Sequence, residues 1–158
     1  MKKQGRIQPY AGNPFYWEYE GEPVLLVGGS REDNLFQISD LKTHLNLLQA
    51  VGGNYIRCTM SSRDEGDVWP FERDPETGLY DLNKPGEAYW SRFSDFLSMT
   101  AERRIFMQIE LWDRFDFARA PWQDNPYNPK NNVNYTAEES GLKPVIETGN
   151  EGLPGIPP

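Results

Sequence analysis

The sequence predicts an α/β fold built around a parallel sheet. Three apolar runs have the length of strands, and the two segments between them repeat apolar residues every three or four positions, as helices do. The resulting order of strand, helix, strand, helix, strand calls for crossover connections between parallel strands. With 158 residues, the chain has the size of one ordinary domain.

The first element expected after an N-terminal arm (residues 1–14) is a β-hairpin or a strand that turns into the next one. Residues 15–27 contain two apolar runs around a polar, glycine-containing turn at 20–22. The second run, residues 24–27, is continuously apolar. Such a run predicts a strand that is buried on both faces, as strands of parallel sheets are.

A helix and a strand follow. Residues 38–51 place their apolar side chains on one helical stripe, with Ser39 or Asp40 as a plausible N-cap and Gly52 as a stop. Residues 54–60 are β-branched and aromatic over the length of a strand, and a strand is therefore expected there.

The second half of the chain begins with a polar stretch at 61–84, followed by a helix at about 86–102 and a third strand at 105–112. From residue 113 onward, the chain is rich in proline and asparagine, and its apolar residues show neither helical nor strand spacing. The sequence thus predicts a partial barrel at 15–112 and a loop-rich tail at 113–158 that ends before a fourth strand.

Alternation of side chains along the last two strands favours a barrel over an open doubly wound sheet. In the strand at 105–112 one face is aliphatic, whereas the other carries Gln108 and Glu110; the polar face of the preceding strand carries Arg57. An unpaired charge beneath covering helices would cost several kcal/mol. A barrel lets such groups point inward to its mouth, where ligands bind. We therefore expect about three βα units of a (β/α)8 TIM-type barrel, with a structural Arg57–Glu110 ion pair as the alternative role of these charges.

Composition excludes several classes of partner and cofactor. The formal charge of -8 repels nucleic acid and anionic lipid, so neither is an expected partner. One cysteine, Cys58, and one histidine, His44, are too few for a Cys/His zinc site, and His44 is expected on the solvated side of its helix. The glycines at 28–29 lack the spacing of a phosphate or dinucleotide loop. No cofactor is expected. The first residues do not read as a secretory signal, which leaves the compartment open.

Carboxylates and tryptophans at the strand ends are the candidates for chemistry. Glycoside hydrolysis uses two carboxylates, and aromatic rings can stack on sugar faces. The candidate carboxylates are Asp64, Glu65, Asp67, Glu110, Asp113 and Asp116, and the candidate rings are Trp69, Trp112 and Trp122. Solvated loop charges and packing against the barrel rim are the alternative roles of these side chains.

Two segments resemble a known family. GNYIRCTMSS is similar to the second-strand signature of the cellulase-like (clan A) glycoside hydrolases, roughly G-x-N-x-[IV]-R, which Gly52, Asn54, Ile56 and Arg57 match. IFMQIELW is similar to the third strand of the same barrels. GGSREDNLFQ, MSSRDEGDVWPF and ELWDRFDF resemble a less studied set of bacterial barrel proteins grouped with these hydrolases, and the resemblance covers about residues 15–140.

The resemblance implies a fragment of a glycoside hydrolase-like barrel that contributes a carbohydrate subsite. It gives Arg57 a role in supporting the nucleophile, while the acid/base and the nucleophile belong to the fourth and seventh strands, so this chain alone is expected to be inactive. The expected substrate-binding residues are Arg57, Gln108, Glu110, Trp112, Asp113, Trp69 and Asp64. The expected partner is an oligo- or polysaccharide, and possible protein partners are the missing half of the barrel or another copy of the chain. The family also makes secretion or a periplasmic location an expectation. The alternatives are a non-catalytic carbohydrate-binding or degenerate barrel module and an unrelated α/β interaction domain.

Overall fold

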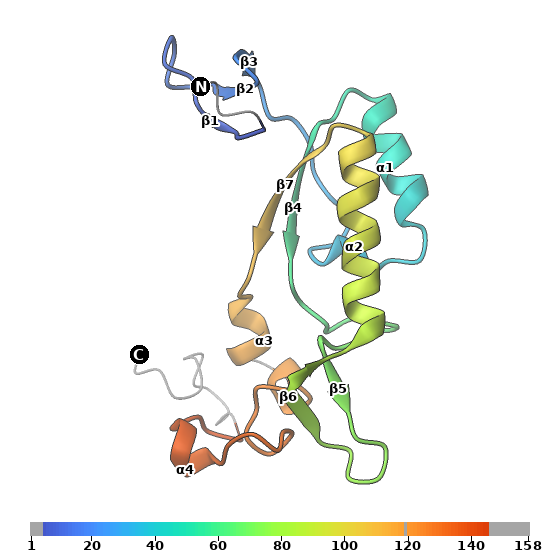
Figure 1. Cartoon of the computed structure of the whole chain (residues 1–158), viewed down its shortest axis with the longest axis vertical. Helices are drawn as coiled ribbons and strands as arrows, with labels where there is room; N and C mark the ends of the chain where they lie inside the picture. The colour runs from blue at the N-terminus through green and yellow to red at the C-terminus, as the bar shows by residue number, and fades with distance from the viewer. Residues whose placement is uncertain (1–4, 119, 146–158) are drawn as a thin grey trace.

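The computed structural model describes residues 5–118 and 120–145, which form a mixed α/β structure with small sheets and four α-helices. The strands are β1 (Gln8–Pro9), β2 (Trp17–Tyr19), β3 (Glu22–Val24), β4 (Tyr55–Thr59), β5 (Phe71–Arg73), β6 (Tyr80–Pro85) and β7 (Phe106–Glu110). The helices are α1 (Leu41–Ala50), α2 (Glu87–Glu102), α3 (Arg114–Ala118) and α4 (Ala137–Ser140), with 3-10 turns η1 (Leu35–Gln37) and η2 (Ala120–Gln123). The β1–β2–β3 sheet lies at one end of an elongated molecule, and the β5–β6 hairpin lies with the short helices at the other end (Figure 1).

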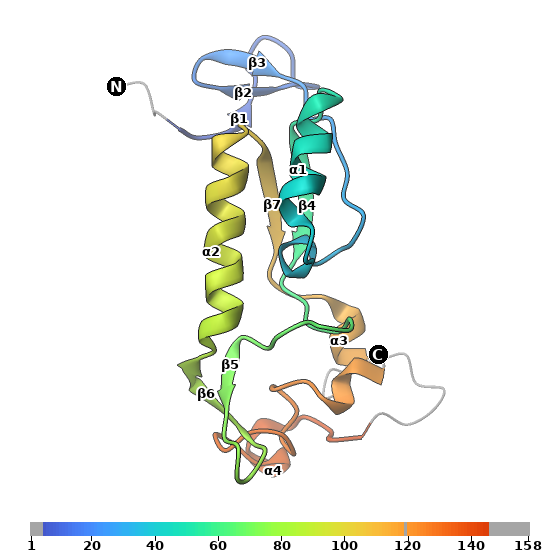
Figure 2. The same cartoon turned by 90° about the vertical axis from the view of Figure 1, so that its right-hand side faces the viewer.

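The centre of the molecule is a pair of parallel strands, β4 and β7, as the sequence predicts. Their register places Arg57 opposite Gln108 and Thr59 opposite Glu110. Helices α1 and α2 lie on the same side of this pair, in front of it in Figure 2. The order of strand, helix, strand over residues 55–110 is therefore confirmed.

The core lies between the strand pair and its helices. The alternate side chains Ile56 and Cys58 of β4 are fully buried against it, and Leu45 of α1 is equally buried. Phe36 of η1 makes an edge-to-face contact with Tyr89 of α2, with 5.0 Å between the ring centroids. The predicted aliphatic face of β4 thus points toward the helices.

The segment before this unit differs from its prediction. A β2–β3 hairpin is present, but β3 ends at Val24, and Leu25 and Val27 are 60% and 52% exposed, so the expectation of a strand buried on both faces is wrong. Instead, the side chain of Asn54 holds this segment beside β4. Its Oδ1 accepts a hydrogen bond from the backbone N–H of Val27 at 2.8 Å, and its Nδ2 donates to the carbonyl of Leu25 at 3.1 Å. Gly28 continues the contact through a parallel bridge to Tyr55.

Two regions expected as loop contain short elements. The polar stretch at 61–84 includes the antiparallel β5–β6 hairpin, whose turn is closed by Asp74; its Oδ1 accepts from two backbone N–H groups at 2.8 Å. The described part of the tail contains α3, η2 and α4. Between the last two, buried asparagines replace regular pairing: the Nδ2 of Asn128 donates to the carbonyl of Trp122 at 2.9 Å, and that of Asn132 donates to the carbonyl of Pro126 at 3.0 Å.

Three further findings complete the description of the fold, and the first two differ from what the sequence predicts. Each sheet in the described residues has two or three strands, and they do not show a closed barrel. His44 is half-buried rather than solvated, and its enclosed Nε2 has no hydrogen-bond partner among the described residues. None of the helices in the part of the chain that the structure describes is long and apolar enough to cross a bilayer.

Candidate functional site

A row of polar side chains lies on the face of β4 and β7 that the helices leave open. Tyr55 donates its hydroxyl hydrogen to Oε1 of Gln108 at 2.5 Å, and Nε2 of Gln108 donates to Oε1 of Glu110 at 3.1 Å. Oε2 of Glu110 then lies 3.3 Å from Nε of Arg57 on the neighbouring strand. The side chains of Arg57 and Glu110 are 50% and 30% exposed, so this row can be reached from solvent.

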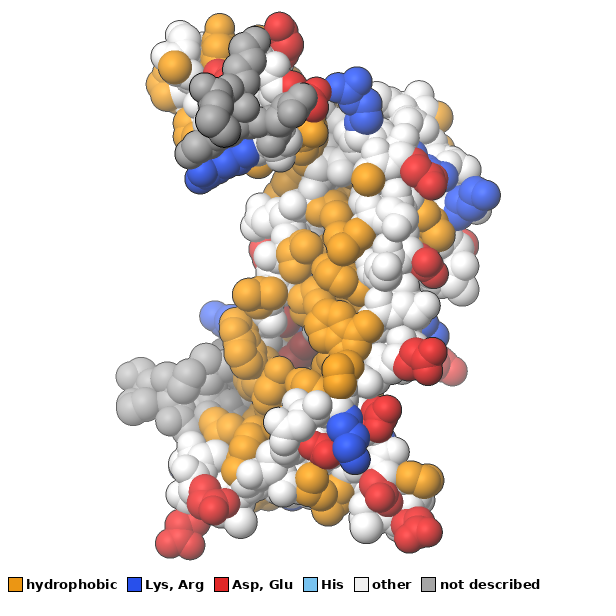
Figure 3. Space-filling view, in the orientation of Figure 1, with side chains coloured by type: hydrophobic (Ala, Val, Ile, Leu, Met, Phe, Trp, Pro, Cys, Tyr) orange, Lys and Arg blue, Asp and Glu red, His pale blue; other side chains and the backbone are white. Residues whose placement is uncertain are grey.

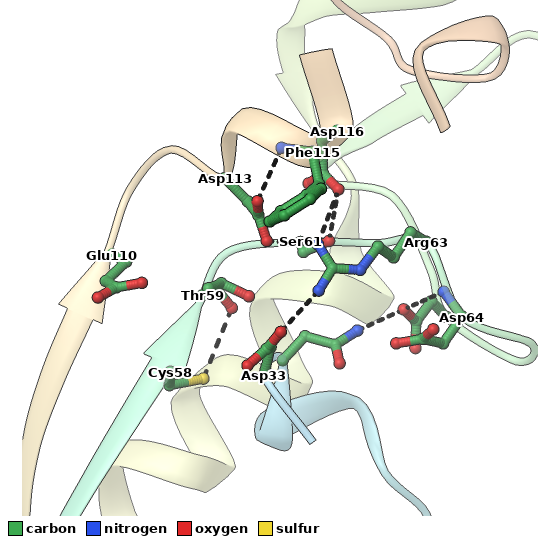
Figure 4. A network of polar contacts seen from close by, with 12 residues as sticks. Asp33, Cys58, Thr59, Ser61, Arg63, Asp64, Glu110, Asp113, Phe115 and Asp116 are labelled. Carbon is green, nitrogen blue, oxygen red and sulfur yellow. Dashed lines mark hydrogen bonds and ion pairs between the residues drawn. The ribbon is translucent and has the colours of Figure 1, made fainter. Parts of the chain in front are cut away.

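A cluster of charges continues the row past the carboxyl ends of both strands. We define the charged cluster as Arg57, Arg63, Asp33, Glu110, Asp113 and Asp116. Arg63 is at its centre: Nη2 lies 2.8 Å from Asp33, and Nη1 contacts Asp113 and lies 3.3 Å from Asp116. Figure 4 shows the Arg63 guanidinium between Asp33 on one side and the carboxylates of Asp113 and Asp116 on the other. Asp33 also joins the two arginines, because its other oxygen lies 3.3 Å from Nη2 of Arg57.

Two chain segments converge at the end of β4 because each is hydrogen-bonded to it or to the loop that follows it. The carbonyl of Asp33 accepts a hydrogen bond from the backbone N–H of Thr59 at 2.7 Å, which holds the loop before η1. Ser61 donates to Oδ1 of Asp116 at 3.0 Å, which holds α3. Asp113, just before α3, accepts from the backbone N–H of Phe115 at 2.9 Å, as residues at helix starts commonly do.

Burial governs the electrostatics of the cluster. It raises the pKa of Asp116, although the hydrogen bond from Ser61 and the nearby Arg63 oppose this rise. Burial disfavours the charged form of Arg63, but its contacts with Asp113 and Asp116 outweigh that effect and raise the pKa of the guanidinium. With two cations and four carboxylates, the ionised cluster carries a net charge of about -2.

The arrangement suits hydrogen bonding to a polar ligand better than metal binding. Guanidinium, amide and carboxylate groups at its exposed end offer both donors and acceptors. In the described residues, no group of three or more His, Cys, Asp or Glu side chains is placed to hold a metal ion.

The three candidate tryptophans occupy different surroundings. Trp112 follows β7, is 64% exposed, and packs against Phe117 with 4.9 Å between ring centroids. Trp69 and Tyr80 both line a separate cavity, and their ring centroids lie 6.3 Å apart. Trp122 is fully buried and donates its indole N–H to the carbonyl of Lys143 at 2.8 Å, so it serves the packing of the tail and is not available to a ligand.

The structure brings most of the expected site residues together at one end of the strand pair. Arg57, Gln108, Glu110 and Asp113 belong to the polar row and the charged cluster, and Trp112 lies next to them in sequence. Trp69 and Asp64 line the separate cavity instead.

Sequence reasoning missed Asp33 and Arg63. Both follow strand-like runs closely, Arg63 only four residues after the last residue of β4. Their position after a strand was the available signal, since residues after parallel strands gather at one edge of the sheet.

Comparison with known proteins finds a similarity of fold and no match in sequence. No protein-family model matches the chain. No curated protein matches it either. A crystal structure described as that of "a putative glycoside hydrolase from Bacteroides vulgatus ATCC 8482" is similar, with a TM-score of 0.58 over 77% of this chain, at 15% sequence identity. The matched region spans 27% of that protein's length. At this identity the likeness concerns the fold alone, so the chain has a fold similar to part of a glycoside-hydrolase-like protein.

Proposed function

We propose that the chain is part of a glycoside-hydrolase-like (β/α) barrel of the cellulase-like type and contributes a carbohydrate subsite to it. The single observation that carries the proposal is the row of Arg57, Gln108 and Glu110, which reaches solvent from two adjacent parallel strands. In barrel enzymes, ligands bind at the carboxyl ends of such strands. The strand pair, with α1 and α2 on its other face, has the layering of successive barrel units.

The chemistry of the row fits sugar hydroxyls. Each hydroxyl can donate one hydrogen bond and accept others, and the exposed guanidinium of Arg57 and carboxylate of Glu110 supply both complements. Trp112, exposed just after β7, offers an aromatic surface beside them. Together these groups supply orientation and stacking, the two needs of a sugar subsite.

The proposed role is binding rather than bond cleavage. A glycosidase needs a protonated carboxyl as its general acid and a second, free carboxylate. Glu110, Asp113 and Asp33 each form an ion pair with an arginine, so none of these three is a free carboxylate. Arg57 would support a nucleophile that other strands of the barrel provide.

Tryptophan fluorescence tests the proposal. Wild-type protein is titrated with neutral pentaoses (cello-, xylo- and mannopentaose), and at least one of them should change the emission in a saturable way. Trp112→Ala should weaken that binding at least tenfold, about 1.4 kcal/mol, because it removes the stacking surface. Trp17→Phe is the control, since Trp17 is 43% exposed on the β1–β2–β3 sheet, away from the row.

Calorimetry of the Glu110→Gln variant gives an independent measurement of pentaose binding, which this substitution should weaken. Glu102→Gln is its control. The side chain of Glu102 is 72% exposed on α2, so its loss of charge should leave binding unchanged. The proposal is refuted if no pentaose binds, or if the Trp112 and Glu110 variants bind as tightly as their controls.

A second candidate is a protein interaction module. Figure 3 shows hydrophobic side chains gathered in the middle of one face of the molecule, with charged side chains mostly around them. Leu111 and Trp90 are 73% and 42% exposed, and Ile109 is 38% exposed. A large exposed apolar patch, such as the one in Figure 3, commonly marks a contact with protein. Sedimentation over a range of protein concentrations tests this second candidate. Self-association of the wild-type chain that Leu111→Ser abolishes would show that the apolar surface contacts another copy of the chain.

A further inference from the structure

A cavity separate from the polar row lies beyond the carboxyl end of β4. It has a volume of about 310 Å3 and is lined by the loop after β4, the β5–β6 hairpin and the segment 121–131. This is near the lower end of the ~300–1,000 Å3 typical of ligand pockets, so it suits one small unit of a ligand. Arg63 is both a wall of this cavity and the centre of the charged cluster, which makes the two sites neighbours.

One wall of the cavity is aromatic and fixed. Tyr80 of β6 is 5% exposed and packs edge-on against Trp69. The guanidinium of Arg73 lies 5.5 Å from the centre of the Tyr80 ring, and its Nε donates to the carbonyl of Gly78 at 2.7 Å. Arg73 is therefore held against the wall, with part of its donor capacity already used.

The remaining charges of the cavity are negative. Asp64, Asp67 and Asp124 line it, and in the described residues Asp64 and Asp124 have no ion-pair partner. Asp67 accepts hydrogen bonds from Asn34 at 2.5 Å and from the backbone N–H of Asp64 at 2.9 Å. Arg63 also lines the cavity, but its guanidinium is ion-paired with three carboxylates outside it. The cavity is lined by three carboxylates and two arginines, Arg63 and Arg73, and Arg63 is already surrounded by three further carboxylates, so an entering anion meets net repulsion.

We propose that this cavity is a second subsite, which binds an uncharged sugar unit and rejects uronate or sulfated units. The proposal rests on the carbohydrate function proposed above and names its substrate class. Carboxylates that lack cationic partners accept hydrogen bonds from sugar hydroxyls, and Trp69 supplies the ring surface. The same carboxylates repel a ligand carboxylate or sulfate, and this repulsion gives specificity against the wrong ligand.

Calorimetric titration at low salt tests the proposal with cello-, xylo- and mannopentaose against pentagalacturonic acid. Wild-type protein should bind at least one neutral pentaose at least tenfold more tightly than the acidic one. The double variant Asp64→Asn/Asp124→Asn should reduce that ratio severalfold by improving the binding of the acid. Raising the salt concentration should also lower the ratio of neutral to acidic pentaose affinity, because salt screens exposed charges.

The control is Asp95→Asn/Glu102→Gln, which removes two exposed charges from α2 outside the cavity and should leave the ratio unchanged. Tight binding of pentagalacturonic acid, or an unchanged ratio in the Asp64/Asp124 variant, overturns this inference while the function proposed for the polar row stands. Absence of binding by every pentaose overturns the proposed function itself, and the inference with it.

Discussion

Replacement of Arg63 by methionine is the sharpest test of the charged cluster. The side chain of Arg63 is 17% exposed, and those of its partners Asp113 and Asp116 are 8% exposed. Methionine keeps most of the apolar stem and removes the cation. Two largely buried carboxylates would then face each other with no compensating charge.

The expected loss of stability is about 3 kcal/mol at pH 7. Removal of one partner from a buried ion pair costs roughly 3–5 kcal/mol, and we take the lower end because water reaches part of Arg63. The pair with Asp33 adds little, since that carboxylate is 50% exposed. For a chain of this size, about 3 kcal/mol corresponds to a fall in Tm of roughly 6–12 °C.

The loss should depend on pH. Burial raises the pKa of Asp116 above its unfolded value of 3.8, so the folded state binds this proton more readily than the unfolded chain does. Stability contributed by such a group falls as pH rises from the unfolded pKa through the folded one. Without Arg63 the folded pKa of Asp116 should rise further, and the difference between variant and wild type should therefore be small near pH 4 and full at pH 7.

Urea unfolding at pH 4 and pH 7 measures both effects, with Arg104→Met as the matched control. The side chain of Arg104 is 83% exposed and its contact with Glu20 is 4.0 Å long, so its loss should cost less than about 0.5 kcal/mol. Equal losses for the two variants at pH 7, or a loss for Arg63→Met that is the same at both pH values, would refute the reasoning.

Three further predictions concern the packing around β4. Gly28→Ala should destabilise the protein by more than about 2 kcal/mol in urea unfolding, because a Cβ there would lie 1.9 Å from a backbone oxygen of β4, whereas Gly29→Ala has open space and should be nearly neutral. Leu45→Ala, at a fully buried site, should cost about 2–5 kcal/mol, and Leu47→Ala on the same helix, 63% exposed, should cost less than about 1 kcal/mol. Burial raises the pKa of Cys58 to about 11, so DTNB should label it slowly at pH 8 in the native protein and rapidly in denaturant; rapid native labelling would contradict its burial.

The central unit of the fold could be predicted because its pattern is local. Residues at spacings of three and four, such as Leu41 and Leu45, form the buried side of α1. Alternation along β4 correctly separated Ile56 and Cys58 from Arg57. The strand predicted at 24–27 was wrong because a continuously apolar run is buried only where other elements cover it on both sides. In the described residues, β4 lies on one side of this run.

The site was predictable only in part for a related reason. Alternation places Arg57 and Glu110 on one face of neighbouring strands, and their pairing follows from the register. Arg63 and Asp33 lie in loops, whose paths depend on long-range contacts such as the bond between the Asp33 carbonyl and the N–H of Thr59. No periodic pattern encodes such contacts, and the β5–β6 hairpin was missed because its strands are short and largely polar.

The buried asparagines of the tail make its order depend on single side-chain amides. Replacement of Asn128 by aspartate would turn a group that donates to two carbonyl oxygens, those of Trp122 and Pro144, into an acceptor that faces them. The apolar contacts between strands and helices would stay intact. Asn128→Asp should therefore open residues 120–145 to proteases well before the rest of the molecule loosens.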